Sequence, residues 1–267
     1  MKTINLFESR QLLLYEYLCA RQRNSNGAVP PAVAHEVAFV RRGMFVVRAN
    51  GREHPATPNH LLLVPLGSEY FIDHPIDGGD ECLITRMSPE VFEEHFGRAT
   101  RAATYVVTSA TFLATQRVRN AAARGQGGAA NPLEVEELLL DLLRSAATDV
   151  GGSRSTPYAT MRERRAVRLA QQLIAERFAE HLPLFDLAEA CGLSPTHLSR
   201  TFHRVTGVRL HRYQNTLRLR TALKRLAEGE RNLTTLALDL GFSDHSHFTS
   251  AFRREYGLPP SQARQTG

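Results

Sequence analysis

The sequence has few of the residues that crosslink, anchor or export a chain. Its 267 residues include no tryptophan and three cysteines, Cys19, Cys82 and Cys191. An odd number of thiols, far apart in the sequence, does not indicate a disulfide framework and fits reduced cysteines in a cytoplasm. There is no run of about 18 apolar residues and no basic N-terminal region followed by an apolar core. We therefore expect a cytoplasmic protein without membrane contact.

Common catalytic motifs are missing as well. The sequence contains no Gly-x-Ser-x-Gly elbow and no His-Glu-x-x-His metal motif. The Gly78-Gly79 pair is not followed by the Lys-Ser or Lys-Thr of a phosphate-binding loop. We therefore expect a protein that is not an enzyme and has no cofactor.

Lysine is scarce, since nearly all of the 33 basic residues are arginine, and the formal net charge is +6. This charge is unevenly distributed. Residues 162–264 contain 17 Lys and Arg against 10 Asp and Glu, a net charge of +7, whereas the rest contains 16 against 17, a net charge of −1. A local positive excess is typical of proteins that bind a polyanion, although charge does not distinguish DNA from RNA.

A short segment occurs twice in this basic region. Leu187-Ala188-Glu189-Ala190-Cys191-Gly192-Leu193-Ser194 recurs as Leu236-Ala237-Leu238-Asp239-Leu240-Gly241-Phe242-Ser243, at an offset of 49 residues. After one inserted residue the pattern continues at an offset of 50, where Leu198, Phe202, Arg204 and Gly207 correspond to Phe248, Phe252, Arg254 and Gly257. Two copies are too few for a solenoid. Each copy is predicted to be a helix, a tight turn and a second helix.

The turn residues support this prediction. Gly192 and Gly241 suit a left-handed residue that ends the first helix, while Ser194 and Ser243 suit the N-cap of the second. Pro195 suits the first helical position.

The second helix of each copy has one apolar stripe, Leu198 with Phe202 and Phe248 with Phe252, and an opposite polar face. The polar residues are Thr196, Ser199, Arg200, His203 and Arg204 in the first copy and His245, Ser246, Thr249, Ser250 and Arg253 in the second. Such a face is either simply solvated or suited to base edges and phosphates in a DNA major groove. The duplication and the local charge favour DNA.

The segment from about Met161 to Arg264 resembles the DNA-binding domain of the AraC/XylS family of bacterial transcription regulators. The run from Gly241 to Ser261 is similar to the family signature almost throughout. The resemblance implies two helix-turn-helix units joined by a long helix at about Leu210–Glu228, with recognition helices one turn of DNA apart. It also allows for RNA polymerase as a partner.

Carried over by position, the resemblance implies base readers in both units. These are Thr196, Ser199 and Arg200 in the first unit and His245, Ser246 and Thr249 in the second; His203, Arg204, Ser250, Arg253 and Arg254 complete the predicted DNA-binding set. At Ser250 and Ala251 the family often has an arginine nearby. The second unit is therefore expected to read bases weakly and to contact mainly the backbone.

The N-terminal third shows the period-two alternation of strands. His35, Val37 and Phe39 alternate with other residues, and Asn50-Gly51 predicts a hairpin turn. Further strands are expected at 61–65, 69–73 and 81–87, which together indicate a small antiparallel barrel or sandwich. Residues 1–23 fit a helix or a strand, and residues 24–31 are expected to be a loop.

Residues 33–87, and the run from Pro58 to Gly67 above all, resemble the cupin-like sensor domain of many AraC/XylS members. The resemblance implies an α+β protein: an N-terminal cupin-like antiparallel β-barrel with following helices, then an all-α domain with two helix-turn-helix units. A barrel of this kind can enclose a small-molecule effector. The candidate ligand-binding residues are His35, Phe39, Phe71 and His74.

A metal site is not expected, although several potential ligands lie in this region. They are His35, His54, His60, His74, Asp77, Asp80 and Cys82. The spacing of metal-binding cupins, two histidines one residue apart and a glutamate shortly after, is absent. Scattered histidines are more often solvated or hydrogen-bonded than metal-bound.

Helical patterns follow the strands. Ser88 and Pro89 predict a helix start, and further helices are expected at 111–124 and 132–150, with a loop at 125–130 between them. We expect a sensor and dimerisation domain at 1–150, with its helical part at about 88–150. A linker at 151–160 and the DNA-binding domain at 161–267 follow, the latter opening with an amphipathic helix at 161–179.

The helix at 132–150 has a broad apolar face whose use the sequence leaves open. Its residues include Leu133, Val135, Leu139, Leu140, Leu142 and Leu143. This face packs either against its own barrel or against a second subunit in a homodimer.

We interpret the sequence as a ligand-responsive, sequence-specific DNA-binding regulator of transcription. The alternative is a small-molecule-binding protein or enzyme whose helical domain is a protein-interaction module.

Overall fold

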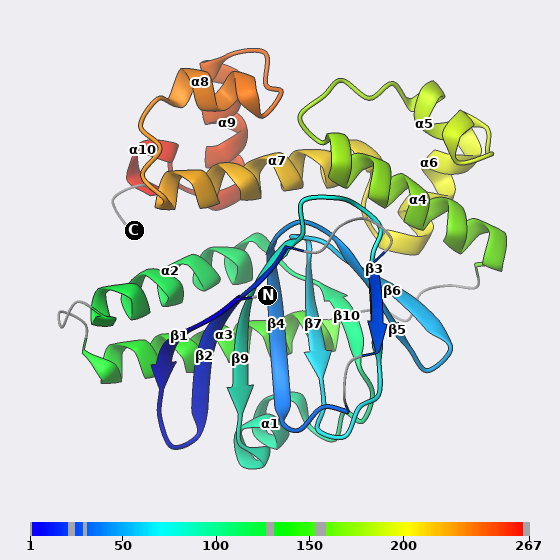
Figure 1. Ribbon diagram of the computed structural model, residues 1–267. Coiled ribbons are helices and arrows are strands. Elements are labelled where there is room, and N and C mark those ends of the chain that lie inside the picture. The colour runs from blue at the N-terminus through cyan, green and yellow to red at the C-terminus, as the bar shows by residue number, and fades with distance from the viewer. Residues whose placement is uncertain (1, 21–24, 29–30, 127–130, 153–158, 264–267) are drawn as a thin grey trace.

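Two antiparallel sheets form the N-terminal part of the protein (Figure 1). The computed structural model describes residues 2–20, 25–28, 31–126, 131–152 and 159–263. The larger sheet has the order β1-β2-β9-β4-β7-β10 and the smaller sheet the order β3-β8-β5-β6. The strands are β1 (Lys2–Glu8), β2 (Leu12–Cys19), β3 (Ser25–Ala28), β4 (His35–Arg42), β5 (Phe45–Ala49), β6 (Arg52–Ala56), β7 (His60–Val64), β8 (Phe71–His74), β9 (Asp80–Met87) and β10 (Ala103–Val106).

The centre of the larger sheet is buried on both faces, as β7 shows with its nearly continuous apolar sequence. Leu61 and Leu63 belong to the core between the sheet and the helices, whereas Leu62 and Val64 belong to the core between the two sheets. Alternate residues of a strand point to opposite faces, so a strand between two cores needs apolar residues at every position.

The N-terminal part also contains three helices: α1 (Pro89–Phe96), which precedes β10, and α2 (Ser109–Gln126) and α3 (Pro132–Gly152), which follow it. Ser88 caps α1 and Pro89 opens it, as predicted. On α3, Val135, Leu139, Leu142 and Leu143 are buried in the core shared with the larger sheet. Packing within the chain therefore accounts for most of the leucine-rich face, while Leu133 remains 60% exposed.

Several sequence-based boundaries differ from the structure. Residues 2–8 and 12–19, which fitted helix or strand, are strands, and β3 occupies residues 25–28 of the expected loop at 24–31. Strand β10 was not predicted. The expected linker began at residue 151, but α3 continues through Gly152, and residues 153–158 lie outside the described residues.

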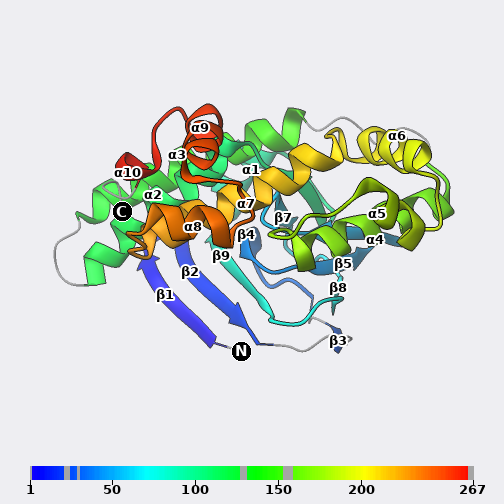
Figure 2. The same cartoon turned by 90° about the horizontal axis from the view of Figure 1, so that it is seen from above.

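The C-terminal part is entirely helical. Its elements are α4 (Met161–Arg177), α5 (Leu184–Ala190), α6 (Pro195–Thr206), α7 (Leu210–Ala227), α8 (Leu233–Asp239), α9 (His245–Tyr256) and α10 (Pro260–Ala263). Seen from above, α7 runs between α4–α6 on one side and α8–α10 on the other (Figure 2). Each helical cluster has its own core, and α7 contributes to both. These observations confirm the predicted α+β class.

Helix α7 also rests on the N-terminal part. The Arg220 side chain is 2% exposed, donates to the carbonyl oxygens of Pro58 and Val107, and lies 4.8 Å from the ring centroid of Phe112. Lys224 Nζ lies 3.1 Å from Glu81 Oε2 on β9. The helix that joins the two helical clusters is thereby fixed to the sheet.

Among the described residues, no helix combines the length and the apolar character needed to cross a membrane.

Candidate DNA-binding surface and adjoining cleft

The sequence repeat is a structural repeat. Helices α5 and α8 begin 49 residues apart, and helices α6 and α9 begin 50 residues apart. Both second helices end at a left-handed glycine, Gly207 with φ 75° and Gly257 with φ 76°. The chain thus forms two helix-turn-helix units with one inserted residue between turn and second helix in the second unit.

Glycines shape both turns, as the sequence predicted. Gly192 has φ 65° and Gly241 has φ 78°, a region that side chains with a Cβ rarely adopt. The two positions differ in their surroundings. A Cβ at Gly241 would lie 1.9 Å from the carbonyl oxygen of Ala179, whereas a Cβ at Gly192 would meet nothing within 4 Å. The second turn is therefore packed against the chain after α4.

The N-caps show the effect of the inserted residue. Ser194 caps α6, since its hydroxyl accepts from the backbone N–H of His197 at 3.3 Å. The prediction that Ser243 caps α9 is wrong: the cap is Asp244, whose Oδ1 accepts from the N–H of His247 at 2.7 Å. The insertion moves the cap by one position, and Ser243 instead donates to Asp244 Oδ2.

The predicted apolar stripes are buried. Leu198 and Phe202 on α6, and Phe248 and Phe252 on α9, have no exposed surface. The rings of Phe248 and Phe252 lie 5.7 Å apart in an edge-on arrangement. Because this seam fixes the rotation of each second helix about its axis, the opposite polar face points away from the core.

Most of the predicted DNA-binding residues lie on that outer face. Nine are exposed: Thr196, Ser199, Arg200, His203, Arg204, Ser246, Ser250, Arg253 and Arg254. His245 and Thr249 are half-buried, and their side chains approach each other at 3.4 Å. The structure thus presents the polar faces of α6 and α9 to solvent.

Arg204 has an intramolecular partner that the sequence pattern did not reveal. Its guanidinium donates to Glu163 Oε1 at the start of α4. Glu163 also completes a capping box, since its Oε2 accepts from the Thr160 N–H at 2.9 Å. The Thr160 N–H, followed by Arg204, lowers the pKa of Glu163 to about 2. The Thr-x-x-Glu spacing in the sequence is a signal for the capping role of Glu163, although not for its ion pair with Arg204.

Arg218 of α7 joins the two units. It donates to the carbonyl oxygens of Phe178 at 2.7 Å, Gly241 at 2.8 Å and Glu180 at 2.9 Å. Burial lowers the pKa of this guanidinium. All three acceptors are backbone atoms, so no side-chain pattern in the sequence could have identified the contact.

Comparison with known proteins agrees with this arrangement. A family model described as a helix-turn-helix domain matches residues 187–266. The virulence regulon transcriptional activator VirF of Yersinia enterocolitica is 26% identical over 232 residues, which are 85% of this chain and 79% of that protein. The transcriptional activator RhaS of Escherichia coli is 38% identical over 92 residues, which are 34% of this chain and 33% of that protein.

These matches support the resemblance of the chain to regulators of the AraC/XylS family. The helix-turn-helix domain and the similarity to transcriptional activators support a DNA-binding regulator of transcription. Among solved structures, ToxT of Vibrio cholerae matches over 97% of this chain and 99% of that chain, with 10% identity and a TM-score of 0.43.

The candidate ligand-binding residues do not lie around one cavity. His35 stacks on Phe92 of α1 at 3.9 Å, and Phe39 is buried between the larger sheet and the helices. Phe71 is 52% exposed, and His74 lies 2.8 Å from Asp80. The space between the two sheets is occupied by apolar side chains such as Val47 and Leu62.

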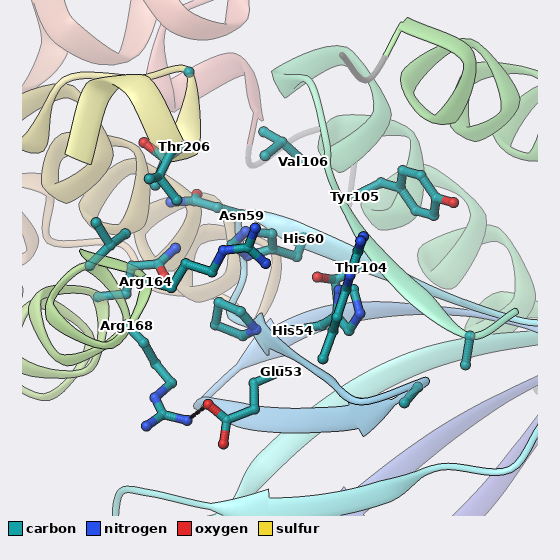
Figure 3. A pocket seen from close by; sticks show the side chains of 18 of the residues that line it. Glu53, His54, Asn59, His60, Thr104, Tyr105, Val106, Arg164, Arg168 and Thr206 are labelled. Atoms are coloured by element: carbon teal, nitrogen blue, oxygen red, sulfur yellow. Dashed lines mark ion pairs between the residues drawn. The ribbon is translucent and has the colours of Figure 1, made fainter. Parts of the chain in front are cut away.

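A large cleft lies instead between the sheets and the helical part (Figure 3). Its volume is 2560 Å³, and it is lined by the β5–β6 hairpin, β10, α4 and α7. Ten arginines line it against four acidic residues: Arg48, Arg52, Arg101, Arg162, Arg164, Arg165, Arg168, Arg204, Arg212 and Arg220 against Glu53, Glu69, Asp73 and Glu255. The cleft is therefore strongly basic.

Two histidines in the cleft are neutral near pH 7. Burial, followed by the neighbouring Arg52, lowers the pKa of His54, and burial, followed by Arg220, lowers the pKa of His60 to about 3. The His60 Nδ1 contacts Thr57 Oγ1 at 3.0 Å, and that oxygen contacts the Tyr213 hydroxyl at 3.0 Å. This chain of contacts connects the wall of the cleft with α7.

Proposed function

We propose that this regulator reads one DNA duplex with both recognition helices, α6 and α9, in successive major grooves. The exposed polar faces of two equivalent units, mounted on one helix, carry this proposal. In a helix-turn-helix protein, the second helix contacts base edges while other groups contact phosphates. We assign base reading to Thr196, Ser199 and Arg200 in the first unit and to His245, Ser246 and Thr249 in the second.

The experiment that tests this proposal compares two arginine variants. Arg200→Ala removes a proposed base contact and should weaken binding to the preferred site by about 1 to 3 kcal/mol, with little effect on random DNA. Arg254→Ala removes a proposed phosphate contact and should weaken binding to both DNAs alike. Equal losses on both DNAs for Arg200→Ala contradict the assigned base reading.

Salt dependence distinguishes DNA binding from the alternative of a protein-interaction module. Contacts to phosphates release counterions, so the affinity for DNA should fall steeply as salt rises. An affinity that is independent of salt supports the alternative.

We infer further that the regulator responds to an anionic small molecule bound in the basic cleft. The excess of arginine, the wall formed by α4 and α7, and the size of the cleft support this location over the filled space between the sheets. A ligand there would contact both parts of the chain. It could therefore favour one arrangement of the recognition helices over another.

Calorimetric titration of the full chain with small carboxylates and phosphate esters tests the effector proposal. Arg164 and Arg168 of α4 lie on the cleft wall in Figure 3. Arg164→Gln should weaken binding of the anion, whereas Arg144→Gln, at an exposed ion pair on α3, should not. DNA footprints that are identical with and without every anion that binds argue against a response.

Homodimerisation and contact with RNA polymerase remain predictions from the resemblance to the AraC/XylS family. The exposed Leu133 at the start of α3 is compatible with a subunit contact.

A further inference from the structure

Three metal-ligating side chains from distant parts of the sequence meet inside the N-terminal part. Cys19 ends β2, His74 ends β8 and Asp80 begins β9. The three residues are buried, with 4%, 3% and 3% of their surface exposed, respectively. Cys19 Sγ lies 3.5 Å from His74 Nε2, which lies 2.8 Å from Asp80 Oδ1. One ligand atom from each of the three lies within 4.8 Å of the others.

The distances suit a tetrahedral ion. Zinc binds sulfur at about 2.3 Å and nitrogen or oxygen at about 2.0–2.2 Å, so ligand atoms in a tetrahedral site are roughly 3.3–3.8 Å apart. The Cys19–His74 distance already falls in this range, and the His74–Asp80 distance needs to lengthen by about half an ångström. Side-chain rotation alone can supply a movement of this size.

The donor atoms select the class of metal. A thiolate, an imidazole and a carboxylate together fit zinc and similar transition-metal ions, whereas magnesium and calcium prefer oxygen ligands alone. Three protein ligands leave a fourth position open, as in zinc sites that bind water or a small molecule.

The backbone holds the three ligands in place. Gly79, in the turn between His74 and Asp80, has φ 65°, and a Cβ there would lie 1.8 Å from the carbonyl oxygen of Cys19. On the other side, a Cβ at Gly43 would lie 2.1 Å from the carbonyl oxygen of Gly79. The turn is thus pressed against the end of β2, so the spacing of the ligands depends on rigid backbone contacts.

A fourth residue orients the carboxylate. The Cys82 thiol donates to Asp80 Oδ2 at 3.8 Å. Metal-binding carboxylates are commonly held by such outer hydrogen-bond partners.

We propose that Cys19 Sγ, His74 Nε2 and an oxygen of Asp80 bind one zinc-class divalent ion. On binding, the Cys19 thiol releases its proton to solvent and the sulfur forms a bond to the metal, while His74 binds as the neutral ring through the Nε2 lone pair, with its proton on Nδ1. The sequence alone did not indicate this site, because 55 residues separate Cys19 from His74 and folding brings them together.

The location connects the site with the DNA-binding part. Glu81, between Asp80 and Cys82 on β9, forms the ion pair with Lys224 of α7. A bound ion would therefore stiffen the strand to which α7 is attached.

Metal titration of the full chain, stripped with a chelator and kept reduced, tests the proposal. Competition with a chromophoric chelator should show one zinc ion bound per chain. Cobalt(II) should bind in its place and give a sulfur-to-cobalt charge-transfer band, because the site contains a thiolate. Cys19→Ser should abolish the band and weaken zinc binding by more than the roughly 10–100-fold typical of losing an outer-sphere partner.

Cys191→Ser is the matched control, since Cys191 is a half-buried thiol at the end of α5, in the C-terminal part. It should keep both the stoichiometry and the band. His74→Gln provides a second ligand variant in case Cys19→Ser does not fold. The proposal is overturned if the unmodified chain binds no stoichiometric zinc, if its cobalt complex lacks the sulfur band, or if Cys191→Ser loses the band.

Discussion

At the scale of single residues, the two glycines of the helix-turn-helix turns have the same backbone conformation but different neighbours. Gly192→Ala places a Cβ at positive φ in open space and should destabilise the protein by about 1 to 2 kcal/mol. Gly241→Ala adds a clash with the Ala179 carbonyl and should destabilise it by about 1 to 3 kcal/mol more. Urea denaturation of both variants measures the difference; equal losses would show that the Ala179 contact does not matter.

The helix caps provide a second residue-scale prediction. Asp244→Ala removes the acceptor of the His247 N–H and should destabilise the second unit by about 1 kcal/mol. Ser243→Ala should change stability by less than about 0.5 kcal/mol, because Ser243 does not cap the helix. Thermal denaturation of the two variants compares them directly. If Ser243→Ala destabilised the protein more than Asp244→Ala, Ser243 would be the N-cap of α9, as the sequence repeat alone suggested.

Residues whose contacts lie within a few positions in the sequence could be assigned correctly from the sequence alone. Gly192, Ser194 and Pro195 act on backbone groups within a few residues, so their roles could be read from the sequence. The ion pair of Arg204 with Glu163 spans 41 residues, and the contacts of Arg220 with Pro58 and Val107 span more than 100. Contacts of this length exist only after folding, and no local pattern predicts them.

At the scale of elements, α4 is tied to α6 through Glu163. Because the pKa of Glu163 is lowered to about 2, its ionised form favours the folded state. Its contribution is complete above the ordinary carboxyl pKa of about 4.5 and is lost as the pH falls toward 2.

Glu163→Gln should therefore lower the melting temperature at pH 7 and reduce the loss of stability on acidification between pH 4.5 and 2. Melting curves recorded between pH 4.5 and 2 test whether Glu163 stabilises the contact between α4 and α6. Unchanged pH dependence in the variant would mean that other groups dominate the acid response.

Elements with a strong period were predicted well, and weakly patterned ones were not. The amphipathic α4 was expected close to its observed bounds, since its apolar face repeats every three to four residues. The bounds of α7 were expected from the resemblance to the AraC/XylS family and are close to those observed. Strand β3, Ser25–Ala28, contains serine, asparagine and glycine, which are typical of loops. It is a strand because β8 pairs with it, which its own sequence does not show.

At the scale of the whole molecule, α7 connects the two helix-turn-helix units with the N-terminal sheets. Arg220 is nearly fully buried, and its removal would leave the carbonyl oxygens of Pro58 and Val107 without this donor. Arg220→Met should destabilise the contact between the two parts by about 3 kcal/mol or more. Hydrogen exchange should then speed up on both sides of the contact; exchange confined to α7 would contradict the role of Arg220 as a bridge.

The same contact should be sensitive to acid through His60. Its folded-state pKa of about 3 is far below the ordinary value of 6.5, so the folded protein favours the neutral ring. The stabilisation is complete above pH 6.5 and is lost as the pH falls toward 3. His60→Gln should flatten the pH dependence of stability in this window, and urea denaturation at several pH values measures it. A variant with the same slope as the unmodified chain would exclude His60 as its origin.

The function proposed for this protein is the reading of a single duplex by two helix-turn-helix units on one helix. Selection of preferred duplexes from a random pool, followed by hydroxyl-radical footprinting on the recovered site, tests it most directly. We predict two protected segments about 10–10.5 base pairs apart, centre to centre, on the same face of the DNA. One protected segment, or two segments at a spacing that does not match a turn of the double helix, would contradict the claim.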